Sequence, residues 1–309
     1  MAFRGGEQGD GHGTSPSGTE QPPLNPAGVV QEFAHAPVRG TRCGRIRSGG
    51  RAPCWLVPPV DPIFLLMRSF LILQLRPEDA ASDSEFEAFL EYGGLHHSKV
   101  VRIRLDREPF PEPGLDRFLG TIVGGSPFEV STPESDKGEQ QRRIEAGFAT
   151  LLEEIVGADL PFLGACSGCG LLGAHCGASL SGRHSEPVGG TDVTLTPAGR
   201  EDPLFEGLPD RFRALVGHKE ACDHLPDGAV LLATSERCPV QMFRIKNNVY
   251  ATQFHPEADP EGFIVRIETY RSHGYFPAEQ ADELIRAVSK EDTPVPRAML
   301  ARFVSRYRT

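Results

Sequence analysis

The chain has 309 residues and a formal net charge of -10. An acidic balance of this size argues against a surface for nucleic acid or an anionic membrane, and it mainly favours solubility. The seven cysteines are an odd number with no paired spacing, and we find no convincing signal peptide, so the pattern is typical of a reducing cytoplasm. The apolar stretch 55–75 is broken by prolines and charged residues, so we expect no membrane span there.

Residues 1–66 have a composition unlike that of the rest of the chain. They contain no lysine, they cluster glycine, proline and arginine, and their apolar residues follow no period of 2 or 3.6. Such a segment buries too little apolar surface to offset its chain entropy, so we predict a disordered N-terminal extension. Met67 stands directly before the first clear strand, and translation starting there would leave the extension out of the protein.

From residue 69 the apolar pattern alternates between strands and helices. It predicts strands at 70–75, 100–105, 118–123 and 160–163. It predicts helices from a cap at Ser82 or Ser84 to Tyr92, at 140–156 and from 171 onward. This alternation indicates an α/β domain built on a mostly parallel sheet with helices on both faces.

After residue 182 the rhythm changes to short strands separated by turns. These strands are predicted at 193–196, 214–216, 230–232, 240–245 and 249–254, and they favour an antiparallel extension of the same sheet. Helices are predicted at 263–270, 277–288 and 296–307. We therefore expect one domain over 67–275 and a helical tail over 276–309 that packs on it.

The most informative stretch is Gly164-Ala165-Cys166-Ser167-Gly168, between a predicted strand and a predicted helix. A tight strand-to-helix turn of this kind lifts one side chain above the sheet edge, and flanking glycines let the turn close. A helix N-terminus also favours the thiolate form of a cysteine. The pattern therefore makes Cys166 a candidate nucleophile rather than a buried small hydrophobic residue.

A cysteine nucleophile needs a base, and the base needs an orienting group. The best candidates stand about ninety residues downstream, in Gln253-Phe254-His255-Pro256-Glu257. The preceding strand brings His255 to the sheet edge, and Glu257 is near enough to fix the tautomer of its imidazole.

A tetrahedral intermediate also needs hydrogen-bond donors for its oxyanion. The strand before Gly124-Gly125-Ser126-Pro127 ends in a glycine pair that can turn backbone N–H groups toward the site. Together with the N–H of Ser167, just after the nucleophile, Gly125 gives a two-donor oxyanion hole.

The glycine pair, Gly-x-Cys-x-Gly and His-Pro-Glu occur here in the order and at the separations found in class I glutamine amidotransferases. The sequence resembles that family over about 69–274, and it is similar to the amidotransferase part of GMP synthase. The resemblance implies a flavodoxin-like fold, a cysteine thioester mechanism that releases ammonia from glutamine, and no cofactor or metal. It implies the roles given above for Cys166, His255, Glu257, Gly125 and Ser167.

The resemblance also implies substrate-side positions at Gly124 and at His218, which stands where family members carry a Ser-His-x-Asp segment. The sequence departs from the family at Gly170, where a glutamine that holds the substrate is usual, and at Ser167, where a bulkier residue is usual. We find no match to the ATP-pyrophosphatase domain of GMP synthase, so the expected partner is a separate synthetase subunit, with an oligomeric state left open.

Three alternatives remain at this point. The enzyme could be a stand-alone γ-glutamyl hydrolase, or a non-catalytic member of the same superfamily. Cys166-x-x-Cys169 is also typical of thiol–disulfide exchange, which makes redox regulation an alternative. A metal site that includes Cys176 is disfavoured, because one helical turn cannot present four tetrahedral ligands.

Overall fold

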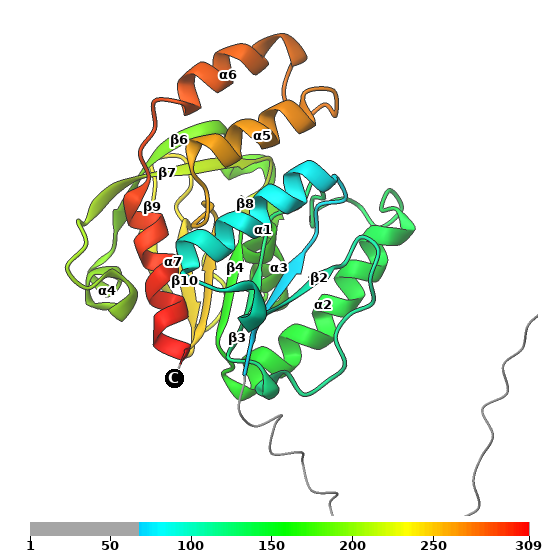
Figure 1. The fold of residues 1–309 in the computed structure, drawn as a ribbon, viewed down its shortest axis with the longest axis vertical. Coiled ribbons are helices and arrows are strands. Elements are labelled where there is room, and N and C mark those ends of the chain that lie inside the picture. The colour runs from blue at the N-terminus through cyan, green and yellow to red at the C-terminus, as the bar shows by residue number, and fades with distance from the viewer. Residues whose placement is uncertain (1–67, 309) are drawn as a thin grey trace, which may run out of the picture. The chain divides into compact units, whose positions relative to one another are not determined.

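A computed structural model describes residues 68–308. The predicted disorder of residues 1–66 lies outside this range. The described chain forms a nine-stranded sheet with strand order β2-β1-β3-β4-β11-β10-β9-β6-β7, and a separate pair made of β5 and β8 (Figure 1). The strands are β1 (Phe70–Gln74), β2 (Val100–Arg104), β3 (Gly120–Val123), β4 (Phe162–Ala165), β5 (Leu180–Ser181), β6 (Glu186–Leu195), β7 (Arg211–His218), β8 (Ala221–Cys222), β9 (Ala229–Thr234), β10 (Met242–Ile245) and β11 (Val249–Thr252).

The five strands from β2 to β11 in the sheet order run parallel, and the last four join them as an antiparallel extension. This confirms the predicted fold class. The parallel part has the flavodoxin-like order, in which β1 lies between β2 and β3. Functional side chains in such sheets gather where the parallel strands end, so the carboxyl ends of β1, β3, β4 and β11 define one edge to inspect.

Helices cover both faces of the sheet and make it a three-layer structure (Figure 1). One face packs against α1 and α7 through a core that includes Phe89, Leu300 and Phe303. The other face packs against α2 and α3 through a core that includes Phe148 and Leu172. The helices are α1 (Asp79–Gly93), α2 (Glu139–Ala158), α3 (Ser167–His175), α4 (Pro197–Glu201), α5 (Pro260–Tyr270), α6 (Ala281–Val288) and α7 (Pro294–Tyr307).

The predicted start of the first helix was wrong by one turn. Helix α1 begins at Asp79, so Ser82 lies inside it, fully buried, and its hydroxyl accepts a hydrogen bond from Arg102. Serine is favoured as a cap only when it directly precedes the helix. Here Ser82 lies within the helix, and its hydroxyl is used in the contact with Arg102 of β2. The predicted end was correct, because Gly94 adopts a left-handed conformation that closes the helix.

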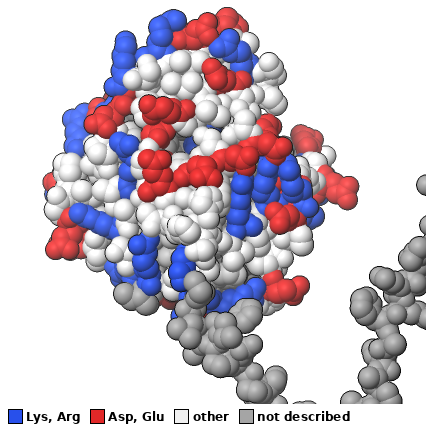
Figure 2. Space-filling view, in the orientation of Figure 1, with Lys and Arg blue, Asp and Glu red and all other residues white. Residues whose placement is uncertain are grey.

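Within residues 68–308, no helix combines the length and the apolar character needed to cross a bilayer. Figure 2 shows one face of the molecule, on which acidic and basic side chains are interspersed around a band of acidic residues. That face therefore offers no continuous basic surface of the kind that binds a phosphate backbone.

Candidate active site

Cys166 is the single residue between strand β4 and helix α3. Its backbone has φ 52° and ψ −99°, a strained conformation for a residue with a Cβ atom. The flanking glycines make this turn possible, because a Cβ on Gly164 would stand 2.7 Å from the backbone of Gly168. The Cys166 N–H donates to the Thr252 carbonyl at 2.8 Å, which ties the turn to β11. The geometry is that of a nucleophile elbow.

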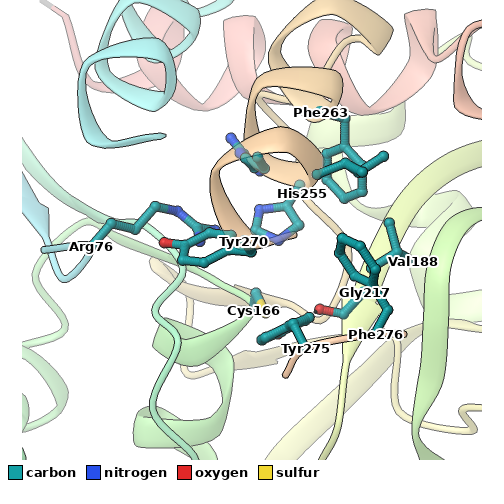
Figure 3. A pocket seen from close by; sticks show the side chains of 11 residues that line it. Arg76, Cys166, Val188, Gly217, His255, Phe263, Tyr270, Tyr275 and Phe276 are labelled. Atoms are coloured by element: carbon teal, nitrogen blue, oxygen red, sulfur yellow. Dashed lines mark hydrogen bonds between the residues drawn. The ribbon is translucent and has the colours of Figure 1, made fainter. Parts of the chain in front are cut away.

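His255 and Glu257 follow β11 at the same edge of the sheet. The His255 N–H donates to the Leu215 carbonyl at 3.0 Å, which ties this loop to β7. Its Nδ1 lies 2.9 Å from Oε1 of Glu257, and both side chains are almost completely buried. Cys166 and His255 line one cavity, as Figure 3 shows. The structure thus brings the three predicted residues together at one edge.

Burial sets the resting protonation of this pair. It raises the pKa of the Cys166 thiol to about 11, and the charges of Arg76 and Arg266 only partly oppose it. Burial also lowers the pKa of His255, against the influence of Glu257. Because Glu257 accepts a hydrogen bond from Nδ1, the lone pair of Nε2 is available on the other side of the ring. Both shifts favour the neutral forms of the thiol and the imidazole.

A group of buried charges behind His255 was missed by the sequence analysis. Arg266 on α5 donates to Oε1 of Glu257 at 2.8 Å and lies 3.9 Å from Glu85 on α1. Arg76, just after β1, donates from Nε to Glu85 at 2.8 Å. Burial alone would raise the pKa of Glu257, but His255 and Arg266 hold it well below its ordinary value. The two arginines balance the two carboxylates.

The predicted oxyanion donors lie in different environments. Ser167 occupies the first position of α3, where its N–H has no partner within the helix. The Gly125 N–H, in contrast, donates to Oε2 of Glu85 at 3.3 Å. Gly124 packs against the same carboxylate, because a Cβ there would stand 2.2 Å from Oε1 of Glu85, and it lines neither cavity beside Cys166. Gly124 therefore makes room for Glu85, and Gly125 makes room for Arg76 and His255.

A second cavity reaches Cys166 from the side of α3. It is lined by Gly170, Leu180, Lys219, Glu220 and other residues, among them His218. A Cβ on Gly170 would stand 3.0 Å from the Leu180 side chain, so Leu180 fills the space next to the position where the family has glutamine.

The predicted substrate residue His218 uses both of its ring nitrogens on protein atoms. Nε2 lies 3.0 Å from Oε2 of Glu186, and Nδ1 lies 2.9 Å from the Glu220 carbonyl. The side chain is 4% exposed, so it shapes the wall of the cavity more than it offers a free ligand. A direct substrate contact by His218 stays a prediction.

In the described part of the chain, residues 68–308, two groups of buried side chains have donor atoms close enough together to hold a metal ion. One consists of Glu186, His218 and Cys238, and the other of Glu85, His255 and Glu257. In the second group, both carboxylates already have guanidinium partners. A cation there would have to displace arginines, so the donor set does not fit a metal.

Cys169, the second cysteine of the pair considered for redox chemistry, lies in the core and lines neither cavity beside Cys166. It is fully buried in the same cluster as Cys222. The neighbouring Cys222 and burial both raise the pKa of Cys169. Both residues and Cys166 carry free thiols.

The fold and the site define a flavodoxin-like α/β protein with a cysteine at a nucleophile elbow and a His–Glu pair at the same sheet edge. The family model "Glutamine amidotransferase class-I" matches residues 98–267. The chain belongs to the class I glutamine amidotransferase family, as the sequence resemblance indicated, and this membership indicates an amidohydrolase.

Known relatives support the family in sequence and in fold. The chain is 30% identical over 151 residues to a glutamine-hydrolysing GMP synthase subunit of Methanopyrus kandleri, covering 48% of this chain and 71% of that protein. It is 33% identical over 116 residues to GMP synthase of Thermosipho melanesiensis, covering 37% of this chain but only 22% of that protein. The fold is similar to that of a glutamine amidotransferase from Thermotoga maritima, with a TM-score of 0.57, 23% identity, and coverage of 77% of this chain and 99% of that one.

Proposed function

We propose that the protein hydrolyses the side-chain amide of glutamine through a covalent thioester on Cys166 and supplies the ammonia to a separate synthetase subunit of the GMP synthase type. The observation that carries the proposal is the elbow cysteine with its strained backbone, which lines one cavity together with His255, itself paired with the buried Glu257.

In the first half of the reaction, Nε2 of His255 takes the thiol proton as the Cys166 sulfur attacks the amide carbon. The C=O electron pair moves to oxygen, and the Ser167 N–H stabilises that charge. When the carbonyl re-forms, the C–N bond breaks, and His255 returns the proton to the leaving nitrogen as ammonia. In the second half, His255 activates water, which releases glutamate and restores the thiol. Glu257 orients the imidazole and stabilises its protonated form.

The cavity on the α3 side of Cys166 is the proposed glutamine pocket. Lys219 lies at this cavity, 3.4 Å from the carboxylate of Glu129, so the pocket offers a positive group beside a negative one. These are the charges that the α-carboxylate and the α-ammonium of glutamine require. The second carboxylate at the cavity, that of Glu220, accepts hydrogen bonds from the backbone of residues 130 and 131. In this proposal Lys219 and Glu129 bind the two charged groups of glutamine, because Gly170 has no side chain with which to contact the substrate.

A direct test compares the wild-type protein with Cys166→Ala in an assay for glutamate and ammonia release from glutamine. We expect the variant to lose activity by about 10⁴-fold or more, since only binding and the oxyanion donors would remain. Equal glutamate release by the two proteins would refute the proposal. Cell extract or a purified synthetase, added to both, then tests whether a partner raises the rate.

A stand-alone γ-glutamyl hydrolase is the second candidate, and one observation favours it. The cavity on the His255 side of Cys166, where the leaving group departs, is lined by Val188, Phe263, Ile267 and Phe276. Such walls suit an apolar amine better than ammonia. A panel of γ-glutamyl amides decides between them, because faster turnover of an apolar γ-glutamyl anilide than of glutamine would favour the hydrolase.

A further inference from the structure

The first three residues after β3, Gly124 to Ser126, supply no free backbone donor at the active site. The Gly124 N–H donates to the Leu73 carbonyl at 3.2 Å, and the Gly125 N–H donates to Glu85 at 3.3 Å. The next N–H, that of Ser126, donates to the hydroxyl of Ser167 at 2.8 Å. A tetrahedral oxyanion is ordinarily held by two preorganised donors, so a second donor besides the Ser167 N–H has to come from elsewhere.

Arg76 is placed to be that donor. It follows β1 at the same sheet edge, is 5% exposed, and lines the cavity that contains Cys166. Its Nε donates to Glu85 at 2.8 Å and its Nη1 donates to the hydroxyl of Tyr270 at 3.3 Å. Within residues 68–308, its third nitrogen, Nη2, donates to no protein acceptor. Two hydrogen bonds therefore fix the guanidinium and leave the Nη2 amino group, with both of its N–H bonds, for another partner.

The free Nη2 lies beside the reacting groups. It is 2.5 Å from the point where a Cβ on Gly125 would stand, and Cε1 of His255 is 2.9 Å from the same point. Figure 3 shows the Arg76 side chain extending past Tyr270 toward Cys166 and His255. Any side chain on Gly125 would displace this guanidinium, so the glycine keeps the space open for it.

The charges around Cys166 agree with this placement. Burial raises the pKa of the Cys166 thiol to about 11, and Arg76 opposes that effect more than any other group does. Arg266 acts in the same direction to a smaller extent, while Glu257 and Glu85 act against it. Tyr270 and Tyr275 also line the cavity, and burial raises the pKa of both, so they stay protonated. His255 is then the group that takes the proton that leaves the thiol.

We propose that Arg76 is a catalytic residue whose Nη2 stabilises first the Cys166 thiolate and then the oxyanion of the tetrahedral intermediate, in the role expected of the Gly125 N–H. This inference rests on the proposed function. As the C–S bond forms, the C=O pair moves to oxygen, and that oxygen lies between Nη2 and the Ser167 N–H. As the carbonyl re-forms and the C–N bond breaks, the negative charge on oxygen disappears. The guanidinium keeps all its protons throughout, because it only donates hydrogen bonds.

The test uses Arg76→Met, which removes the charge, and Arg76→Lys, which keeps the charge but loses the fork geometry. The control is Arg213→Met, which removes an arginine paired with Glu291 outside both active-site cavities. Two quantities are measured on each full-length protein: the pH dependence of iodoacetamide alkylation at Cys166, read by mass spectrometry, and kcat and KM for glutamine hydrolysis.

For Arg76→Met we expect the alkylation pKa of Cys166 to rise by about one pH unit or more. We expect kcat to fall by about 10²–10³-fold with KM nearly unchanged, as on loss of one oxyanion donor. Arg76→Lys should keep the alkylation pKa and recover part of kcat, and the control should match wild type. An unchanged alkylation pKa and kcat, or a loss confined to KM, would overturn the proposal.

A second variant keeps the test decisive if Arg76→Met does not fold. Tyr270→Phe removes the acceptor that fixes Nη1, together with the donor to Glu78, and leaves the charge paired with Glu85. We expect a loss of about tenfold in kcat in a protein that still folds, and an unaltered kcat would contradict the proposal. Because alkylation needs no turnover, it also separates this inference from the proposed function: an inactive wild-type protein refutes the latter, while the alkylation profile still reports on Arg76.

Discussion

Replacing Arg266 by methionine tests whether the buried charges behind His255 act as one unit. Arg266 is 5% exposed and donates to Glu257 at 2.8 Å, and the face of its guanidinium lies over Phe263. Without it, Glu257 would keep a buried charge with only His255 as partner. Two charges about 4 Å apart at an effective dielectric constant of about 20 interact by about 4 kcal/mol. Loss of one partner of a buried pair costs about 3–5 kcal/mol.

We therefore expect Arg266→Met to lower the free energy of unfolding by about 3–5 kcal/mol at pH 7, measured by urea denaturation. The matched control is Arg271→Met, just after the same helix. Its pair with Asp282 has a comparable distance of 2.6 Å, but the two side chains are 42% and 69% exposed. An exposed pair contributes about 0–1 kcal/mol. Equal destabilisation by the two substitutions would refute the reasoning.

The pH dependence provides a second check on the same variant. Because the pKa of folded Glu257 is held well below its ordinary value of 4.5, its contribution to stability is present above that value and is lost as pH falls through the folded-state pKa. Removal of Arg266 raises the folded-state pKa and reduces the contribution. The difference between wild type and Arg266→Met should therefore shrink in acid. If the difference in unfolding free energy between the two proteins is constant from pH 7 to pH 3, the destabilisation comes from lost packing and not from lost charge.

Three further outcomes are expected. Because burial lowers the pKa of His255, hydrolysis should stay constant down to about pH 6.5, the ordinary histidine value, and fall only below it; a midpoint above that value would contradict this. Gly125→Ala should lower kcat by at least about 10²-fold, because its Cβ would meet the His255 ring at 2.9 Å, while Gly157→Ala, with open space around it, should be neutral or stabilising. Lys219→Met should raise KM by about tenfold with little change in kcat, which steady-state kinetics will show.

The order of the motifs made the core of the site predictable. Strand β4, the turn at Cys166 and helix α3 are local in sequence, so the glycines at 164 and 168 were enough to predict the elbow. His255 was predictable because a strand that ends in His-Pro can only deliver that side chain near the sheet edge. The sheet class followed from the alternation of strands and helices. Its antiparallel extension followed from the short strands separated by turns that are predicted after residue 182.

The buried charges were not predictable, because their burial depends on contacts between distant segments. Glu85 and Arg266 stand on amphipathic helices, where a charged residue normally faces solvent, and nothing local marks them as buried partners. Arg76 carried a usable signal, since it follows a parallel strand whose end meets the same edge as Cys166. The glycine pair at 124–125 was assigned to oxyanion binding, although close contact with Glu85 and Arg76 explains its small size as well.

The dominant effect at this site is desolvation, and it determines how the nucleophile has to work. Burial moves the pKa of Cys166 up to about 11 and that of His255 down, so both shifts favour the neutral forms of the two groups. In the proposed reaction, proton transfer from the thiol to His255 therefore accompanies attack on the amide, and a negative charge appears first on sulfur and then on oxygen. A fixed guanidinium is worth most under these conditions, because it needs no reorganisation as the charge develops. In the proposed mechanism, burial thus disfavours the thiolate before substrate binds, and the Arg76 guanidinium lies at the cavity where the reaction creates negative charge.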